Sequence, residues 1–262
     1  MTDLREHLVV VRGGGDLGTG VAWRLRRVGF PVVVLDLPRP LAVRRTVAFA
    51  SAIIDGSIVV DGVEAVHVPD ARAVRGVLSE NRIPVIASDV VPDLAQPHSV
   101  IVDARVAKRV LDTRIDDAPF VVALGPGFVA GVDCDAVVET KRGHRLGRVI
   151  WEGPAAADTG TPGVLGGASA ERVVRAPVSG NVSWTSTIGD IVGAGDLLGS
   201  IDGEPIAAPI AGVVRGLIAP GPVDVGLKIG DIDPRGDAGA ATEISDKALS
   251  VGGGVLEAIL VW

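Results

Sequence analysis

The stretch Leu8-Val9-Val10-Val11-Arg12-Gly13-Gly14-Gly15-Asp16-Leu17-Gly18 decides the fold of the first half of this chain. Its aliphatic run predicts a buried strand, and apolar residues at three- and four-residue steps over Leu17–Val28 predict a helix. The glycines between them have the G-x-G-x-x-G spacing of a dinucleotide-binding turn, in the strand-to-helix context that this motif requires. In such a turn Gly13 makes the tight bend, Gly15 admits a pyrophosphate, and Gly18 lets the helix pack closely on the strand.

A phosphate-bearing ligand is the predicted occupant of this turn, because free N–H groups at the start of a helix attract anions. Asp36 ends the next predicted strand, 18 residues after Gly18, which is roughly where an acidic residue binds ribose. Asp16 is unfavourable beside a phosphate, and capping of the helix is its favoured role. A tight turn without ligand is the alternative. The predicted cofactor-binding residues are Gly13, Gly14, Gly15, Asp16, Gly18, Asp36 and, from a later segment, Arg142.

Strands and helices alternate through the first half of the chain. Aliphatic runs predict strands at Val32–Leu35, Val63–Val68, Val85–Ala87, Val100–Val102 and Phe120–Leu124. Helical segments are predicted at Pro40–Ala50, Ala71–Asn81 and Ala104–Leu111. This alternation is typical of α/β proteins with a mainly parallel, Rossmann-like sheet. We therefore predict a Rossmann-like domain over residues 1–130.

The second half predicts a β-rich domain over residues 131–262, because glycine, proline and short Val/Ile runs replace the helical pattern. The boundary is open, since Asp133–Gly167 fits either half. Within this domain Ala176–Val182 returns as Ala208–Val214, a repeat of 32 residues that predicts a barrel-sandwich unit over about 172–234. The repeat resembles biotinyl/lipoyl modules, which carry a lysine at a hairpin tip. The matching stretch Ser200–Ile206 has no lysine, so neither modification is expected.

Composition narrows the class of protein. The chain has 262 residues, 47% of them hydrophobic and 22% charged, as in ordinary globular proteins. Its 35 glycines are about twice the usual share. A net charge of −7 and the lack of a basic run argue against nucleic acid as a partner. Aliphatic runs of four or five residues argue against a membrane span, and a single cysteine, Cys134, fits a reducing compartment, so the cytoplasm is expected.

A second polar segment supplies candidate catalytic residues, namely His144, Cys134 and Glu139. Glu139 and His144 lie with Arg142 on one turn after a predicted strand, Ala136–Val138, and a second glycine turn follows at Asp158–Gly163. Solvated turns are the alternative interpretation. Cys134 is more often an inert apolar residue, and its flanking aspartates disfavour a thiolate. The remaining histidines are scattered, so no metal site is predicted.

Taken together, five motifs resemble one bacterial family. They are Arg12–Leu17, Pro38–Val47, Gly125–Phe128, Glu139–Arg148 and Gly252–Ala258. The family is that of the selenium-dependent molybdenum hydroxylase system proteins, and the Glu139–Arg148 segment is also similar to xanthine dehydrogenase accessory factors. The resemblance covers nearly the whole chain.

The resemblance implies an accessory role in the maturation of molybdenum hydroxylases rather than classical enzyme activity. It implies a molybdopterin-type cofactor or its nucleotide as ligand, help with its modification or insertion, and a hydroxylase client as partner. The client, a role for selenium and the formation of a homo-oligomer stay open. An NAD(P)-dependent oxidoreductase using the same glycine turn is the alternative.

Overall fold

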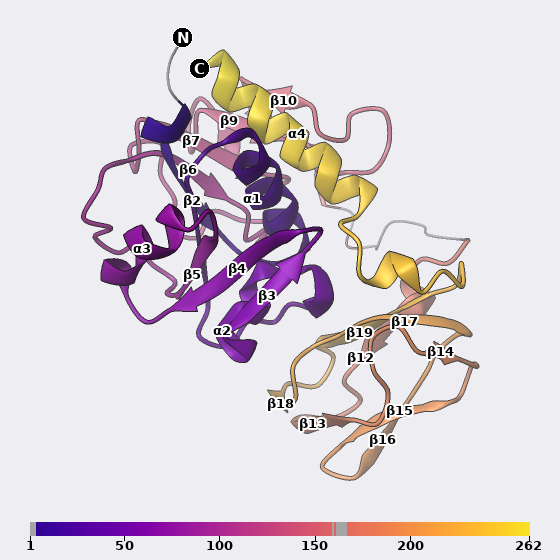
Figure 1. Ribbon diagram of the computed structural model, residues 1–262. Coiled ribbons are helices and arrows are strands. Elements are labelled where there is room, and N and C mark those ends of the chain that lie inside the picture. Colours follow the sequence, from indigo (N-terminus) through magenta and orange to yellow (C-terminus); the bar gives the residue numbers. More distant parts are fainter. Residues whose placement is uncertain (1–3, 159, 161–166) are drawn as a thin grey trace. The chain divides into compact units, whose positions relative to one another are not determined.

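The computed structural model describes residues 4–158, 160 and 167–262 and divides the chain into two units (Figure 1). Unit 1 comprises Met1–Pro40, Ala48–Thr159 and Ile244–Trp262, and unit 2 comprises Leu41–Val47 and Gly160–Glu243. Thus neither unit is continuous in sequence. This division differs from the expected boundary at residue 130, because later segments pair with and cover the first sheet.

The helices of unit 1 are α1 (Asp16–Val28), α2 (Ala52–Asp55), α3 (Val74–Ser79) and α4 (Asp246–Val261). Its strands are β1 (Leu8–Arg12), β2 (Val32–Asp36), β3 (Ser57–Val60), β4 (Val63–Val68), β5 (Ile83–Ala87), β6 (His98–Asp103), β7 (Phe120–Leu124), β8 (Val129–Ala130), β9 (Ala136–Val138), β10 (Val149–Ile150) and β11 (Gly153–Pro154). Short 3-10 turns lie at Leu4–Glu6, Phe49–Ser51 and Ala71–Ala73.

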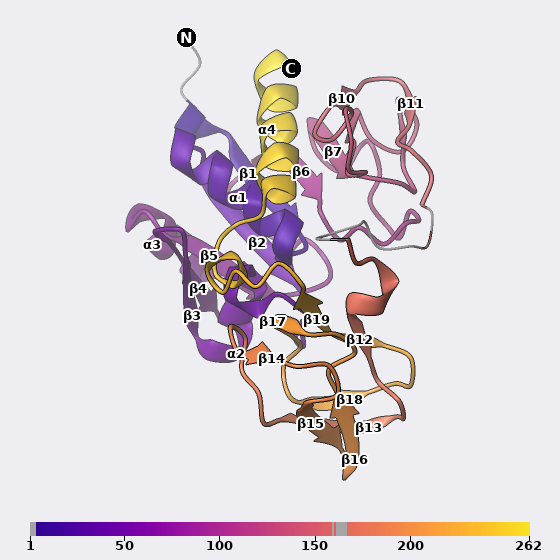
Figure 2. The same cartoon turned by 90° about the vertical axis from the view of Figure 1, so that its right-hand side faces the viewer.

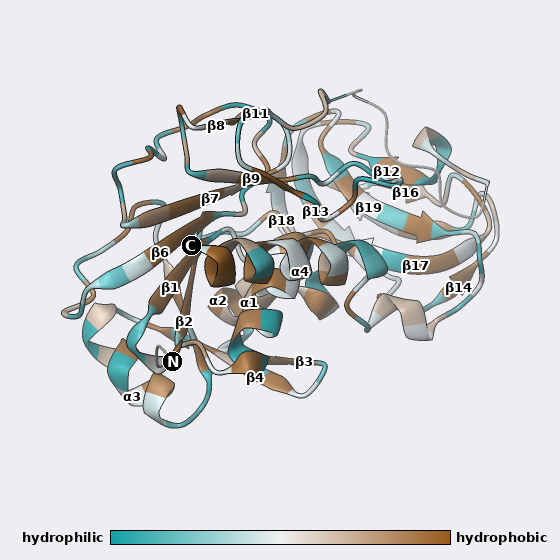
Figure 3. Ribbon diagram, turned by 90° about the horizontal axis from the view of Figure 1, so that it is seen from above, coloured by the Kyte–Doolittle hydropathy of each residue, from teal (hydrophilic) through white to brown (hydrophobic). Residues whose placement is uncertain are grey.

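Unit 1 is built on a nine-stranded, mostly parallel sheet of order β10-β9-β7-β6-β1-β2-β5-β4-β3. Only the outermost pairs, β10 with β9 and β3 with β4, are antiparallel. Helices cover both faces, with α1 and α4 on one side and α3 on the other (Figure 3). The central strands β1, β2 and β7 are therefore buried, as their continuous aliphatic runs require, whereas the outer strand β3 is partly exposed.

The last helix returns to unit 1 and packs beside α1 (Figures 1 and 2). Small residues make this packing close. A side chain on Gly20 would lie 2.6 Å from the Ala248 carbonyl oxygen, and one on Gly252 would lie 2.6 Å from that of Gly20. Gly254 faces Gly147 in the same way. The glycines of α4 thus fix it against both α1 and the loop that follows β9.

Two predicted helices of the first half are wrong. Residues 104–111 form a loop, because Val106 and Lys108 adopt left-handed backbone and Arg105 is held by Asp103. Pro40–Ala50 is not a continuous helix. Its segment Leu41–Val47 belongs to unit 2, where the Arg45 Nε donates to the Leu217 carbonyl at 2.8 Å.

Unit 2 consists of two four-stranded antiparallel sheets, of order β12-β19-β17-β14 and β16-β15-β13-β18. The strands are β12 (Val173–Arg175), β13 (Gly180–Trp184), β14 (Ile191–Val192), β15 (Leu197–Ile201), β16 (Glu204–Ala207), β17 (Gly212–Leu217), β18 (Gly221–Val223) and β19 (Lys228–Asp233), with 3-10 turns at Arg45–Val47, Ala170–Arg172 and Gly239–Ala241. Both sheets contribute to one apolar core, in which Val182 and Val214 hold equivalent places in the repeat. The hairpin tip between β15 and β16 is Asp202-Gly203.

Candidate functional site: the carboxyl edge of the parallel sheet

The glycine turn joins β1 to α1 as predicted, and packing explains three of its glycines. Gly13 has a φ of 104°, and a side chain there would lie 2.9 Å from the backbone of Ala104. A side chain on Gly14 would lie 2.8 Å from Val34, and one on Gly18 would collide with the Gly13 carbonyl oxygen. Larger residues at these positions would disrupt the turn itself.

Gly15 is different because a side chain there would meet no atom of the described residues within 4 Å. It is the N-cap of α1, in extended backbone that other residues adopt without strain. The predicted capping role of Asp16 is therefore wrong, since Asp16 is the first residue of the helix. The space beside Gly15 borders the first-turn N–H groups of α1, which have no partner within the helix.

Asp36 lies at the end of β2 and holds the glycine turn. Its Oδ2 accepts from the Gly14 N–H at 2.7 Å, and its Oδ1 accepts from the Leu37 N–H at 2.8 Å. Burial raises the pKa of Asp36, and these two hydrogen bonds oppose that shift. The carboxylate thus lies next to the turn, at the position where a ribose hydroxyl would be bound in a dinucleotide site.

Glu139 follows β9 and is 3% exposed. One carboxylate oxygen accepts from the Lys141 N–H at 2.7 Å and the other accepts from the Ala156 N–H at 2.8 Å. The residue therefore ties the turn that follows β9 to the segment that follows β11. Both oxygens are engaged, so the predicted catalytic use of Glu139 competes with a structural one.

Arg142 and His144 lie on the turn after Glu139, but they are not brought together as a catalytic pair. The Arg142 guanidinium makes two hydrogen bonds with Asp246, the first residue of α4, at 2.7 and 2.9 Å. His144 is exposed, and its carbonyl accepts from Arg148 at 3.4 Å. Of the second glycine turn, residues 159 and 161–163 lie outside the described residues.

Lys247 is the residue at this edge that the sequence analysis missed. It follows Asp246 in the first turn of α4 and makes no hydrogen bond or ion pair with any residue that the structure describes. Burial lowers the pKa of Lys247 and nearby Arg142 lowers it further, whereas Asp16, Glu139 and Asp246 oppose the shift. The signal available in the sequence was Ser245, a good N-cap that precedes an apolar periodic segment.

Cys134 lies at the other end of β9 from Glu139 and is fully buried. Burial raises the pKa of its thiol to about 12, with Asp133 and Asp135 adding to the shift. The thiol is therefore protonated at neutral pH and closed to solvent. The structure separates Cys134 from the polar turn and supports the inert interpretation.

The remaining residues converge because parallel strands end at one edge of a sheet. β1, β2, β7 and β9 run in one direction, so the glycine turn, Asp36 and Glu139 all follow carboxyl ends. The N-termini of α1 and α4 reach the same edge, since Gly20 lies against Ala248 and since Arg142, on the turn after β9, binds Asp246. Two helix N-termini, an open glycine and Lys247 favour an anion at this edge, whereas the nearby carboxylates of Asp16, Glu139 and Asp246 oppose one.

Fold and site together define an α/β protein with a large, mostly parallel sheet and a glycine turn at its carboxyl edge. None of the helices within the described residues is long and apolar enough to cross a membrane. Nor do these residues contain a cluster of three or more histidine, cysteine, aspartate or glutamate side chains that could hold a metal ion.

Comparison with known proteins adds one relative of high similarity. The chain is 46% identical over 258 residues to the uncharacterized protein YqeB of Escherichia coli. The match covers 98% of this chain but 48% of that protein, so the chain spans about half the length of its relative. The chain matches no protein-family model.

Solved structures show only weak likeness. A succinylglutamate desuccinylase/aspartoacylase of Rhodobacter sphaeroides is 27% identical over 24% of this chain and 22% of its own, with a TM-score of 0.22. The ectoine utilization protein EutE (DoeB) of Ruegeria pomeroyi is 11% identical over 87% of this chain and 58% of its own, with a TM-score of 0.24. TM-scores this low do not show a shared fold.

Proposed function

We propose that the carboxyl edge of unit 1 binds a phosphate-bearing cofactor of the molybdopterin type, and that the protein assists the maturation of molybdenum hydroxylases. The observation that carries the binding proposal is the open space beside Gly15 at the N-terminus of α1, with Lys247 at the same edge. The molybdenum part rests on the family resemblance of the five sequence motifs.

The residues at this edge fit a phosphate or pyrophosphate group. Backbone N–H groups in the first turn of α1, which have no acceptor within the helix, would donate to its oxygens, and the Lys247 ammonium would offset its charge. Arg142 would contribute a second cation. Its guanidinium would either leave Asp246 for the ligand or donate hydrogen bonds to both. The cofactor would supply the metal chemistry of the client, while this chain would bind, orient and release its phosphate end.

We propose that unit 1 is Rossmann-like, with its ligand at the glycine turn, and that unit 2 is a barrel-sandwich of the biotinyl/lipoyl type. The tip Asp202-Gly203 offers no lysine for a prosthetic group, so unit 2 would serve as a scaffold or as a surface for the hydroxylase client. The cytoplasm is the proposed site of this work.

The test is ligand binding by a matched pair of glycine variants. Gly15→Val places a side chain in the open space at the helix start, and Gly76→Val places one in open space on α3. We expect Gly15→Val to lose calorimetric binding of a molybdopterin dinucleotide, and Gly76→Val to bind like wild type. Equal affinity in all three proteins would remove the glycine turn from the site.

An NAD(P)-dependent oxidoreductase is the second candidate, and one observation favours it. Asp36 lies beside the Gly14 N–H at the end of β2, the place of the ribose-binding carboxylate in NAD sites. Titration with NADH, followed by its fluorescence, separates the two candidates. Nucleotide released from the purified protein gives a second readout, because cytidine monophosphate favours the pterin and nicotinamide favours the alternative.

A further inference from the structure

A buried hydroxyl, that of Thr113, lies at the centre of a polar network in unit 1. Thr113 belongs to the loop between β6 and β7 and is 1% exposed. Its hydroxyl donates to Asp103 at 2.7 Å and accepts from the guanidinium groups of Arg12 and Arg105 at 2.8 and 2.9 Å. A hydroxyl has one donor and two acceptor sites, so all three are used. Thr113 thus joins the last residue of β1 to the last residue of β6.

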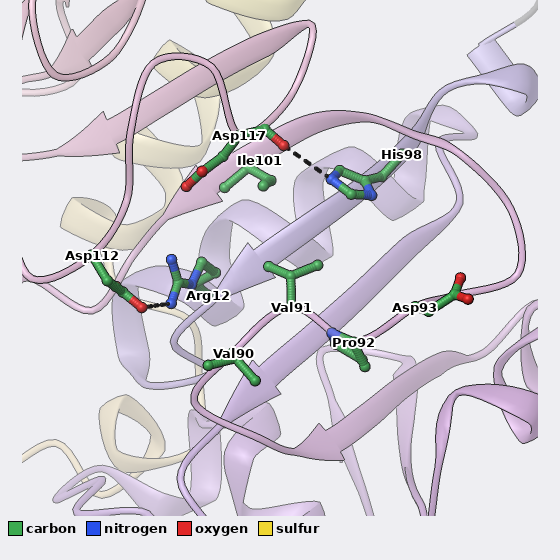
Figure 4. Close-up of a pocket in the computed structure, with 9 residues that line it drawn as sticks. All are labelled: Arg12, Val90, Val91, Pro92, Asp93, His98, Ile101, Asp112 and Asp117. Carbon is green, nitrogen blue, oxygen red and sulfur yellow. Dashed lines mark hydrogen bonds and ion pairs between the residues drawn. The ribbon is translucent and has the colours of Figure 1, made fainter.

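Two ion-paired arginines extend this network. Arg12 and Arg105 each approach Asp112 to 2.7 Å, and Figure 4 shows the Arg12 pair beside a pocket. Arg105 also donates to Asp103 at 2.6 Å. Although burial raises the pKa of Asp112, hydrogen bonds from both arginines lower it below its ordinary value, so the pairs persist at neutral pH. Two arginines balance two aspartates, so the network holds segments together rather than attracting an ion.

The network lies directly next to the glycine turn in the chain. Arg12 precedes Gly13, and Asp103 precedes Ala104, whose N–H donates to the Arg12 carbonyl at 2.7 Å. A side chain on Gly13 would lie 2.9 Å from the Ala104 backbone, and one on Gly18 would lie 3.2 Å from the Ala104 methyl group. Ala104 is therefore a wall of the turn, and the end of β6 determines where that wall stands.

The two strands that Thr113 joins mark a change of direction in the sheet. β1 lies between β2 and β6, so the chain leaves β1 on one side and returns to β6 on the other. In doubly wound sheets, ligands bind outside the carboxyl ends of the strands at this point. Because Thr113 is buried, it does not reach such a ligand itself and acts on the site only through the backbone that it holds.

We propose that Thr113 is a positioning residue for the phosphate-binding site at the glycine turn. Its hydroxyl holds the carboxyl ends of β1 and β6 together, so that Ala104 stays against Gly13 and the first-turn N–H groups of α1 keep their direction. This inference rests on the function proposed above for that edge. Binding groups must be held within about 0.5 Å by the hydrogen bonds behind them, so loss of such a support weakens binding.

The test is calorimetric titration of the full-length protein with inorganic pyrophosphate. Thr113→Val removes the hydroxyl without changing charge and with little change in volume, and we expect it to weaken binding roughly tenfold. Thr113→Ser keeps the hydroxyl and should bind like wild type. Thr46→Val is the matched control, because it removes a 2.6 Å hydrogen bond to the Ala241 carbonyl in unit 2 and should leave the affinity unchanged.

Amide hydrogen exchange gives a second readout, which needs no ligand. The Ala104 amide should exchange faster in Thr113→Val than in Thr113→Ser, because its bond to the Arg12 carbonyl loosens. Equal exchange in the two variants overturns the inference.

The pyrophosphate titration separates this inference from the proposed function. Unchanged affinity in Thr113→Val overturns the inference and leaves the proposed function standing. Where the valine variant does not fold, Arg105→Lys takes its place, because lysine keeps the charge but lacks the fork that binds Asp103 and Asp112 together. A wild-type protein that does not bind pyrophosphate overturns the proposed function and the inference with it.

Discussion

Asp36 and Glu139 show how a carboxylate at a sheet edge acquires its role. Each offers two oxygens, and all four accept a backbone N–H, so both residues fix loops at the edge that carries the candidate site. The sequence alone predicts that Asp36 and Glu139 are polar residues at the ends of strands. It does not show that Ala156 folds back onto Glu139, because that contact depends on the path of the loop.

Cys134 yields a prediction at the same scale. An acid whose pKa is raised on folding costs stability once the unfolded chain ionises, so stability falls as the pH rises above the ordinary thiol value of 9.0 towards about 12. Between about pH 8 and about pH 10, wild type should lose about 1 kcal/mol more than Cys134→Ala in urea unfolding. Rapid modification of the native thiol by a disulfide reagent at about pH 8 would contradict this account.

At the scale of elements, the strands and the glycine turn were predictable because their signals are local. β1, α1, β2 and β7 follow from runs of aliphatic residues and from the spacing of glycines. The helix predicted at 104–111 was wrong because ion pairs hold that segment as a loop. Lys247 was missed because its place beside Asp16 depends on α4 packing against α1, far away in the sequence.

Two adjacent glycines of α4 test that packing. Gly252→Ala should destabilise the protein by about 1–3 kcal/mol, because the new methyl group would press on the Gly20 carbonyl. Gly253 has its nearest neighbour at 4.0 Å, so Gly253→Ala should stabilise the helix by about 0.5–1 kcal/mol. The measurement is urea unfolding, and equal effects of the two substitutions would show that α4 does not depend on close contact.

At the scale of the molecule, unit 1 is completed by a segment that lies beyond unit 2 in the sequence. Removal of residues 244–262 should abolish cooperative unfolding of unit 1, because the buried side chains of Val251, Val255 and Ile259 would no longer pack in it. Unit 2 should keep its sheets. In the truncated protein, which lacks Trp262, Trp184 reports on unit 2 once Trp23 and Trp151 are replaced by phenylalanine, because its indole N–H donates to the Ile218 carbonyl at 2.9 Å. Far-UV circular dichroism follows unit 1, and a cooperative transition of unit 1 with a midpoint unchanged by the truncation would contradict this prediction.

The split of unit 1 also bears on its synthesis. While the ribosome adds the residues between Thr159 and Trp262, the surface of α1 that α4 will cover stays open. At 5–20 residues per second this interval lasts roughly 5–20 s, which is long compared with the collapse of a nascent chain. The newborn protein therefore passes through a stage with exposed apolar surface, in which a chaperone that holds such surfaces would raise its yield.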